Sequence, residues 1–367
     1  MTTTPPLDGI KVLDFSELLP GPFFTQSLAD LGASVIKVER PPHGDNARLL
    51  GAGGFEAVNR GKRSLLVNLK QEDAREELYA LADEADILVE TYRPGVMARL
   101  GMDAETVRAR NPRLIYVSLT GYGQDGPWAH WPGHDINYLA AAGALALTGT
   151  DEDWPASNLG LPVADLCGSS SALSATLAAL YQRRATGEGQ YLDVSITDSV
   201  LHWMTARIGA FRSDGKSDLA AQRAVTVTKP AYGAFACRDG RHVTIAALED
   251  HFWMRLVEAI DMGPFASADY ARMPARKAAA EAINRQIASA CRDRDADELL
   301  RDLVCHDIPA APVVAPSDLH EVPQFAAREM WASDGELALP RFPVRLDGAH
   351  DAVGAPTLDD YRLNKDS

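Results

Sequence analysis

The chain has 367 residues, enough to bury a large core and, at about 150 residues per domain, to form roughly two domains. Its 36 Lys and Arg against 51 Asp and Glu give a net charge of −15, which argues against nucleic acid or an anionic membrane as the main partner. No apolar run reaches the ~18 to 20 residues that span a bilayer, and residues 1–6 lack a signal-peptide pattern, so we expect a cytoplasmic protein with no membrane partner.

The first half of the chain alternates predicted strands with predicted helices. A helix over Pro22–Leu31 connects the first two strands, and the turn before it lacks both the GxGxxG spacing and a phosphate loop, which disfavours nicotinamide and ATP chemistry. The alternation predicts an α/β fold with a mostly parallel sheet. The predicted strands are Lys11–Phe15, Ser34–Val38, Ser64–Leu69, Asp86–Val89, Leu114–Val117 and Tyr191–Ile196.

In a parallel sheet, ligands bind beyond the carboxyl ends of the strands. Arg40, Arg93 and the segment Thr120–Tyr122 fall at such ends, and Lys62 lies in a loop before a strand. The three basic side chains could be surface charges, but their positions at the ends of strands or loops favour binding of an anionic ligand.

The second half predicts a different organisation. Residues 211–228 are polar and irregular, which is typical of a linker, and Tyr232–Ala246 predicts a β-hairpin around the turn at Arg238–Arg241. Helical patterns follow, so this part predicts a smaller α+β domain. The expected division is a large α/β domain over 1–210, a linker over 211–228, a small domain over 229–315 and a C-terminal segment over 316–367 that returns to the large domain.

Two titratable side chains stand at predicted helix starts. His134 follows Pro132 and Gly133 at a loop-to-helix junction, where Asp135 can cap the apolar run that begins at Ile136. Asp165 opens the next helical pattern. Taken alone, the first is most simply a structural histidine and the second a helix cap, but together they favour acid–base chemistry. The four cysteines form no CxxC pair, which predicts reduced core thiols and no metal site.

Several motifs stand in register along the chain: Leu7–Asp14, Pro20–Pro22, Leu28–Ala33, Val38–Pro41, Asn59–Lys62, Tyr92–Gly95 and Gly121–Gly123. Together they resemble the family III CoA-transferases, the CaiB/BaiF group, which also contains α-methylacyl-CoA racemase. The resemblance implies an acyl-CoA substrate, with CoA as part of the substrate and no tightly bound cofactor. It also implies an interlocked homodimer with the active site between the large domain of one subunit and the small domain of the other.

The stretch from His134 to Tyr138 resembles the racemase subgroup. By that resemblance the catalytic histidine and aspartate map onto His134 and Asp165, and a supporting glutamate maps onto Glu249. The implied CoA contacts are Arg40, Val67, Asn68, Leu69, Lys70, Ala85, Asp86, Ile87, Arg93, Gly133, His134, Asp135, Ile136, Asn137 and Tyr138.

Three hypotheses follow. The first is an isomerase that inverts the α-carbon of a 2-methylacyl-CoA, with His134 and Asp165 exchanging the proton on opposite faces. The second is a transferase that moves CoA between carboxylic acids, with Asp165 as the nucleophile and no need for the imidazole. The third is an acyl-CoA-binding or regulatory protein that has kept the fold.

Overall fold

The computed structural model describes residues 4–150, 153–332, 338–346 and 356–361. The chain forms two compact units, which are described separately. Unit 1 comprises Met1–Leu145, Ala156–Ile208 and Pro323–Ser367, and unit 2 comprises Ala146–Pro155 and Gly209–Val322.

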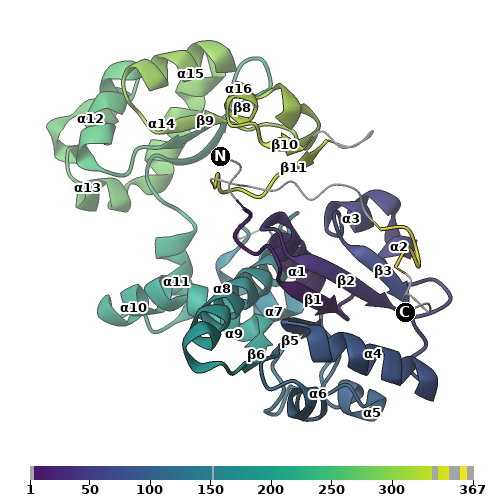
Figure 1. The fold of residues 1–367 in the computed structure, drawn as a ribbon. Helices are drawn as coiled ribbons and strands as arrows, with labels where there is room; N and C mark the ends of the chain where they lie inside the picture. The colour runs from purple at the N-terminus through teal and green to yellow at the C-terminus, as the bar shows by residue number, and fades with distance from the viewer. Residues whose placement is uncertain (1–3, 151–152, 333–337, 347–355, 362–367) are drawn as a thin grey trace. The chain divides into compact units, whose positions relative to one another are not determined.

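Unit 1 is built on a six-stranded, fully parallel sheet in the order β3-β2-β1-β4-β5-β6 (Figure 1). The predicted α/β fold and each of the predicted strands of this sheet are confirmed, with ends shifted by a few residues. The strands are β1 (Lys11–Asp14), β2 (Ser34–Glu39), β3 (Arg63–Leu66), β4 (Ile87–Glu90), β5 (Ile115–Thr120) and β6 (Tyr191–Ser195).

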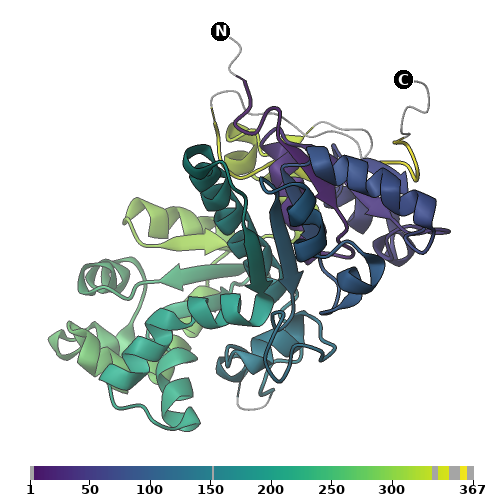
Figure 2. The ribbon, with the colours of Figure 1, turned by 60° about the horizontal axis from the view of Figure 1, so that its bottom comes forward.

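Helices cover both faces of this sheet, because alternate residues of a strand point to opposite sides. In β4, Ile87 and Val89 pack in one buried cluster with residues of α1 and α8, whereas Leu88 packs in another with residues of α4 and α6. Figure 2 shows the two helical layers from a second direction. The helices of unit 1 are α1 (Pro20–Asp30), α2 (Ala47–Leu50), α3 (Ala52–Ala57), α4 (Glu72–Glu84), α5 (Val96–Leu100), α6 (Ala104–Arg110), α7 (Asp135–Ala141), α8 (Val163–Thr186), α9 (Ile196–Trp203) and α16 (Pro323–Ala327).

Helix α8 is long and apolar enough, by length and composition, to cross a membrane. It packs against α1, α9 and the strands β5 and β6, and its Ala164, Cys167 and Ala172 belong to the buried cluster on that face of the sheet. Burial against a sheet explains its apolar character, because a helix in the core of a layered fold passes the same test.

Residues 356–361 of the C-terminal segment lie along the edge strand β3. The backbone N–H of Tyr361 donates to the carbonyl of Ser64 (2.8 Å). The carboxylates of Asp360 and Asp359 accept from the N–H groups of Ser64 (2.6 Å) and Leu66 (3.2 Å). These bonds satisfy backbone groups that an open sheet edge would expose.

Unit 2 contains a three-stranded antiparallel sheet, β7 (Tyr232–Ala236), β8 (His242–Ala246) and β9 (Ala310–Pro312), which confirms the predicted hairpin. The irregular structure predicted over 211–228 is wrong, because this segment contains the end of α10 (Thr205–Ser213) and all of α11 (Leu219–Thr226). The Asp218 carboxylate accepts from the N–H of Ala221 (2.8 Å) and starts α11, a cap that the polar composition concealed. The remaining helices are α12 (Asp250–Ala259), α13 (Met273–Ala278), α14 (Ala280–Arg292) and α15 (Ala296–Cys305).

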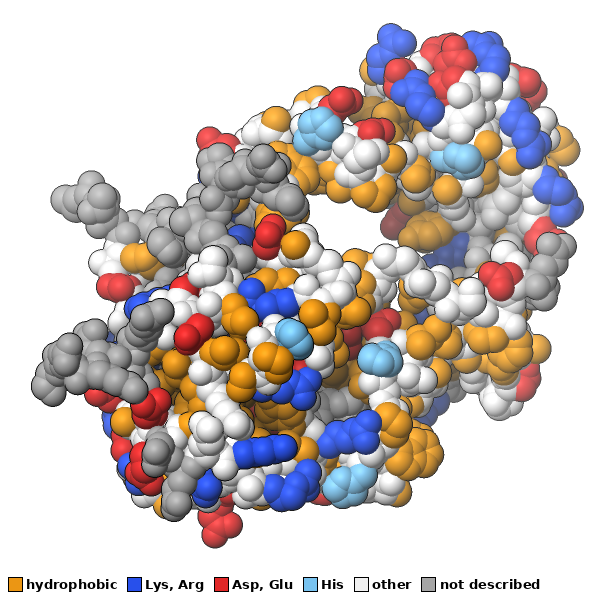
Figure 3. Space-filling view, turned by 90° about the vertical axis from the view of Figure 1, so that its right-hand side faces the viewer, with side chains coloured by type: hydrophobic (Ala, Val, Ile, Leu, Met, Phe, Trp, Pro, Cys, Tyr) orange, Lys and Arg blue, Asp and Glu red, His pale blue; other side chains and the backbone are white. Residues whose placement is uncertain are grey.

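Charges of both signs are interspersed with hydrophobic side chains on the face drawn in Figure 3. Basic side chains are thus present on this face although the net charge of the chain is −15. An anionic ligand can be bound where such groups converge, without a positive protein overall.

Candidate active site

The order of the parallel sheet reverses between β1 and β4, so the loops after these two strands diverge and leave a crevice at their carboxyl ends. The loops are joined there by a hydrogen bond from the N–H of Glu17 to Oγ1 of Thr91 (3.2 Å). Ligands of doubly wound folds bind at this position, and the site described below lies beside it.

A cavity of about 430 Å³ opens at the carboxyl ends of β4 and β5. Its wall combines the segment after β4, the segment after β5 and the loop that leads into α7. The cavity therefore brings Arg93 together with His134, two residues that the sequence assigned to the site from distant segments. The lining residues are Thr91, Tyr92, Arg93, Pro94, Thr120, Gly121, Tyr122, Ala129, Trp131, Pro132, Gly133, His134, Asn137 and Tyr138.

His134 is the N-cap residue of α7, as its position after Pro132 and Gly133 predicts, and its side chain is exposed. Its backbone N–H donates to Oδ1 of Asn137 (2.9 Å), which fixes the first turn. The Tyr138 hydroxyl donates to the carbonyl of Gly133 (2.7 Å). A Cβ added at Gly133 would lie 2.6 Å from the Tyr138 ring, and one at Gly121 2.3 Å from it, so both glycines allow this ring to brace the loop that carries the imidazole.

Asp135 does not cap the helix that it begins, which corrects the prediction from sequence. Its Oδ1 instead accepts hydrogen bonds from the backbone N–H groups of Ala164 (2.6 Å) and Asp165 (3.1 Å), at the start of α8. A carboxylate is favourable there because the first N–H groups of a helix have no partner within the helix. One side chain thus ties the helix start after His134 to the helix start that carries Asp165.

Asp165 lies in the first turn of α8 and is partly buried. Within the described part of the chain, no hydrogen-bond donor reaches its carboxylate. Burial and, to a smaller extent, the negative charge of Asp135 together raise the pKa of Asp165 to about 7. A carboxyl group that titrates near neutral pH can both take up and release a proton, so it suits acid–base work.

This raised pKa predicts a pH-dependent stability effect. The unfolded chain releases the Asp165 proton near pH 4, whereas the folded chain holds it to about pH 7, so folding weakens as pH rises between these values. We expect Asp165→Asn to remove that loss, so the stability of the variant relative to the native protein increases by roughly 2 kcal/mol between pH 5 and pH 8. Urea unfolding at the two pH values measures the difference.

A second titrating group and a control variant have to be considered when the change in stability is assigned to Asp165. Burial also raises the pKa of Glu90 to about 7, so native stability falls over the same range for a second reason, and only the difference between variant and native isolates Asp165. Asp103 caps α6, and hydrogen bonds from Thr106 hold its pKa below the usual value although burial opposes them. Asp103→Asn should therefore show no change in relative stability between pH 5 and pH 8, and an equal change in both variants would contradict the prediction.

The predicted CoA contacts fall into two groups. Arg93 lines the cavity, exposed Arg40 follows β2 and pairs with Glu17 (3.4 Å), and residues 67–70 follow β3, so these lie at the carboxyl edge of the sheet. The structure does not bring residues 85–87 to this edge. They lie at the amino end of β4, where Ile87 is fully buried and the Asp86 carboxylate pairs with Arg183 (2.8 Å).

Lys62 cannot bind a CoA phosphate, which corrects a second expectation, because its side chain is wholly buried. Its Nζ donates to Oγ1 of Thr25 (2.7 Å), Oδ1 of Asn59 (2.8 Å) and the carbonyl of Pro22 (3.0 Å), and it pairs with Asp14 (3.3 Å). The ammonium group therefore stabilises the start of α1 through its hydrogen bonds to Pro22 and Thr25. Sequence reasoning missed this role, because a lysine in a polar loop carries no local sign of burial.

The CoA-transferase family III matches residues 7–360 of the chain. The chain belongs to this family. It is 34% identical to acetyl-CoA:oxalate CoA-transferase of Acetobacter aceti, over 97% of this chain and 93% of that protein. It is also 34% identical to succinyl-CoA:mesaconate CoA-transferase of Haloarcula hispanica, over 97% and 94%.

The human α-methylacyl-CoA racemase is 34% identical over 70% of this chain and 65% of that protein. A CaiB/BaiF family protein from Brucella suis superposes with a TM-score of 0.86 at 31% identity, over 97% of each chain. The family resemblance and its α/β fold are thus confirmed, and the relatives are enzymes that act on CoA thioesters. These two transferases match 97% of the chain, whereas the match to the racemase covers 70% of it.

Two further residues have simple positions: Glu249, to which the resemblance maps a supporting glutamate, and Cys167, two residues after Asp165. Glu249 is the exposed N-cap residue of α12 in unit 2, so its relation to the imidazole in unit 1 stays a prediction. Cys167 is buried in α8, and burial raises the pKa of its thiol to about 11, which removes it as a nucleophile at neutral pH. Among the described residues, no cluster of three or more His, Cys, Asp or Glu could hold a metal ion.

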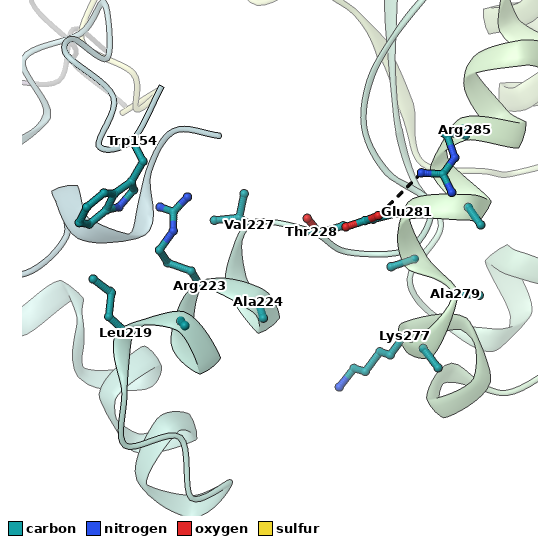
Figure 4. A pocket seen from close by; sticks show the side chains of 14 residues that line it. Trp154, Leu219, Arg223, Ala224, Val227, Thr228, Lys277, Ala279, Glu281 and Arg285 are labelled. Carbon is teal, nitrogen blue, oxygen red and sulfur yellow. Dashed lines mark ion pairs between the residues drawn. The ribbon is translucent and has the colours of Figure 1, made fainter. Parts of the chain in front are cut away.

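A cavity of about 1020 Å³ in unit 2 is lined by none of the predicted catalytic or CoA-binding residues (Figure 4). Arg223 of α11 crosses one side of it, where its guanidinium donates to the carbonyls of Ala146 (3.2 Å) and Thr148 (2.8 Å). Glu281 pairs with Arg285 (3.7 Å) on the opposite side. Arg223 and Arg285 are thus already hydrogen-bonded or ion-paired, and none of the predicted catalytic side chains lines this cavity. The smaller cavity at His134 is therefore the candidate active site.

Proposed function

We propose that this family III member catalyses proton exchange at the α-carbon of a 2-methylacyl-CoA, and so inverts its configuration. The observation that carries the proposal is the connection through Asp135, which holds the helix starts of His134 and Asp165 together at one edge of the sheet. An imidazole exposed in a cavity and a carboxyl group of raised pKa at the helix start tied to it through Asp135 supply two groups that can exchange a proton near neutral pH.

A proton α to a thioester is weakly acidic, so its removal needs a base within hydrogen-bond reach. In the proposed reaction one of the two groups removes this proton and leaves an enolate of the thioester. The other group then delivers a proton to the opposite face of the same carbon, which returns the thioester with inverted configuration. His134 and Asp165 exchange roles when the substrate has the other configuration.

Incubation with a 2-methylacyl-CoA of one configuration in deuterated water tests the proposal. We expect deuterium at the α-carbon together with loss of optical purity, both detected by mass spectrometry and chiral chromatography of the released acid. If incubation with folded protein puts no deuterium at the α-carbon of the substrate, the proposal is contradicted. A matched incubation with a 2,2-dimethylacyl-CoA, which has no α-proton, shows whether any mass increase arises elsewhere.

A second candidate is CoA transfer between carboxylic acids, which the similarity to transferases over nearly the whole chain favours. Here the Asp165 carboxylate attacks the acyl-CoA carbonyl and expels CoA as its thiolate, giving a mixed anhydride. The thiolate then attacks the aspartyl carbonyl and releases the carboxylic acid, which leaves CoA on the aspartate as a thioester. Mass spectrometry of protein incubated with acyl-CoA, with hydroxylamine to trap the thioester, would detect this intermediate at Asp165.

For either reaction we propose that CoA lies along the carboxyl edge of the sheet, with Arg40, residues 67–70, Arg93 and residues 133–138 as its contacts. The exposed guanidinium groups suit the phosphates, and the position agrees with the crevice of the sheet. We further propose a cytoplasmic homodimer in which Glu249 of the small domain completes the site. Gel filtration tests the dimer.

A further inference from the structure

Two indoles stand exposed on the loop that leads into α7. Trp128 and Trp131 are 41% and 55% exposed, and their rings stack with centroids 5.1 Å apart and planes 22° apart. The edge of Tyr122 meets both of them, at 5.9 and 6.4 Å. Tyr122 also meets Tyr138, the ring that braces the imidazole loop, at 5.3 Å. We call these four residues the aromatic cluster.

The backbone holds this loop in place before any ligand arrives. The N–H of Trp131 donates to the carbonyl of Trp128 (2.8 Å), and the N–H of Ala129 donates to the carbonyl of Gly126 (3.3 Å). Pro132 follows directly and restricts the chain. The indole of Trp131, the more exposed of the two, is thus a rigid, flat and apolar surface. A rigid surface loses little conformational entropy when a ligand covers it.

Trp131 lines the same cavity as His134, three residues along the chain. If the reacting carbon lies at the imidazole, as the proposed function requires, the groups within reach are the acyl substituent and the thioester end of the pantetheine arm. The adenine ring lies at the far end of that arm. The pantetheine arm carries polar amide groups, whereas the acyl substituent can be wholly apolar, so the flat apolar surface beside the reacting carbon suits the acyl substituent better.

We propose that Trp131, supported by Trp128 and Tyr122, forms the subsite for the acyl group, and that this subsite selects acyl-CoA esters whose acyl group carries an aromatic ring. Ring-on-ring contact adds about 0.5 to 1.5 kcal/mol beyond the burial of area, which corresponds to a factor of about 2 to 10 in affinity. The inference rests on the proposed function for the position of the reacting carbon, but not on which of the two reactions occurs.

Equilibrium binding of three compounds to the full-length protein tests the inference: free CoA, phenylacetyl-CoA and cyclohexylacetyl-CoA. Phenylacetyl-CoA has no stereocentre at its α-carbon, so proton exchange in water regenerates the same compound. Without an acceptor acid, CoA transfer gives no net product either, so the titration measures binding. Titration calorimetry should show that phenylacetyl-CoA binds about 2- to 10-fold more tightly than its saturated analogue. Trp131→Leu should abolish this ratio, Trp131→Phe should keep it, and both should bind free CoA as the native protein does.

Trp203→Leu, at an indole that is 58% exposed on α9 and outside the cavity wall, is the matched control and should leave all three affinities unchanged. Equal losses for free CoA and phenylacetyl-CoA in Trp131→Leu would overturn the inference, because the indole would then contact the CoA portion. A phenyl preference that survives Trp131→Leu would overturn it too, whether or not gel filtration shows an altered oligomeric state for the variant. Failure of the deuterium experiment with this binding pattern intact would remove the racemase proposal and leave the subsite.

Discussion

His134→Ala and Asp165→Asn should each abolish inversion of a 2-methylacyl-CoA, and each should spare part of the deuterium exchange of one enantiomer only. In a two-base mechanism each group faces the α-proton of one configuration, so each variant keeps the base for the other configuration. Loss of a positioned base costs roughly 10²- to 10⁴-fold. Deuterium incorporation measured separately for the two enantiomers, for both variants, gives the complementary pattern.

His130→Ala is the matched control, because His130 is an exposed histidine of the same loop outside the cavity wall, and its rates should match the native protein. CoA transfer predicts another pattern, in which Asp165→Asn removes activity and His134→Ala retains CoA transfer within about tenfold. Equal loss of exchange for both enantiomers in one variant, with none lost in the other, would contradict the two-base mechanism.

Lys62→Met should destabilise the protein by about 3 to 5 kcal/mol, because it removes one partner of a buried ion pair. Burial alone would raise the pKa of Asp14, but Lys62, Lys37 and hydrogen bonds from two hydroxyl groups together hold the pKa of this carboxyl below its usual value. Removing Lys62 leaves the Asp14 carboxylate without its nearest cation in the core. Urea unfolding, followed by circular dichroism, measures the loss.

Two variants separate charge from packing. Lys62→Met combined with Asp14→Asn removes the stranded charge and should recover a substantial part of the lost stability. Arg110→Ala breaks the pair with Asp83 (2.6 Å), whose side chains are 42% and 39% exposed, and should cost less than about 1 kcal/mol. A similar cost for Lys62→Met and Arg110→Ala would show that the buried pair contributes no more than a surface one.

Local patterns predicted the elements well where buried hydrophobic residues form a continuous run or recur at helical spacing. The strands β1, β2 and β4 and the helix α14, with Ile283, Ile287 and Cys291 on its buried face, follow hydrophobic spacings that the sequence displays directly. The pattern failed over 211–228, where α11 has no buried residue of its own to set a periodicity. Capping by Asp218 starts that helix instead.

The site shows the same division. The glycine and proline before His134 predicted a helix start, and the apolar residues after Asp165 predicted another, because both signals lie within a few residues of the side chain. The assignment of Asp135 as the cap of α7 was wrong, because its partners, Ala164 and Asp165, lie about thirty residues away and are reached only through packing of α7 against α8.

The sequence by itself determined the family, the parallel sheet and the two side chains on which the chemistry is proposed to depend, because motifs and periodicity are properties of neighbouring residues. The tertiary structure alone decided that Lys62 is buried, that Asp135 joins two helix starts, and that Trp131 and His134 share one cavity. These facts depend on which distant segments pack together, and burial and long-range hydrogen bonds fix a side chain's role only after that packing is set.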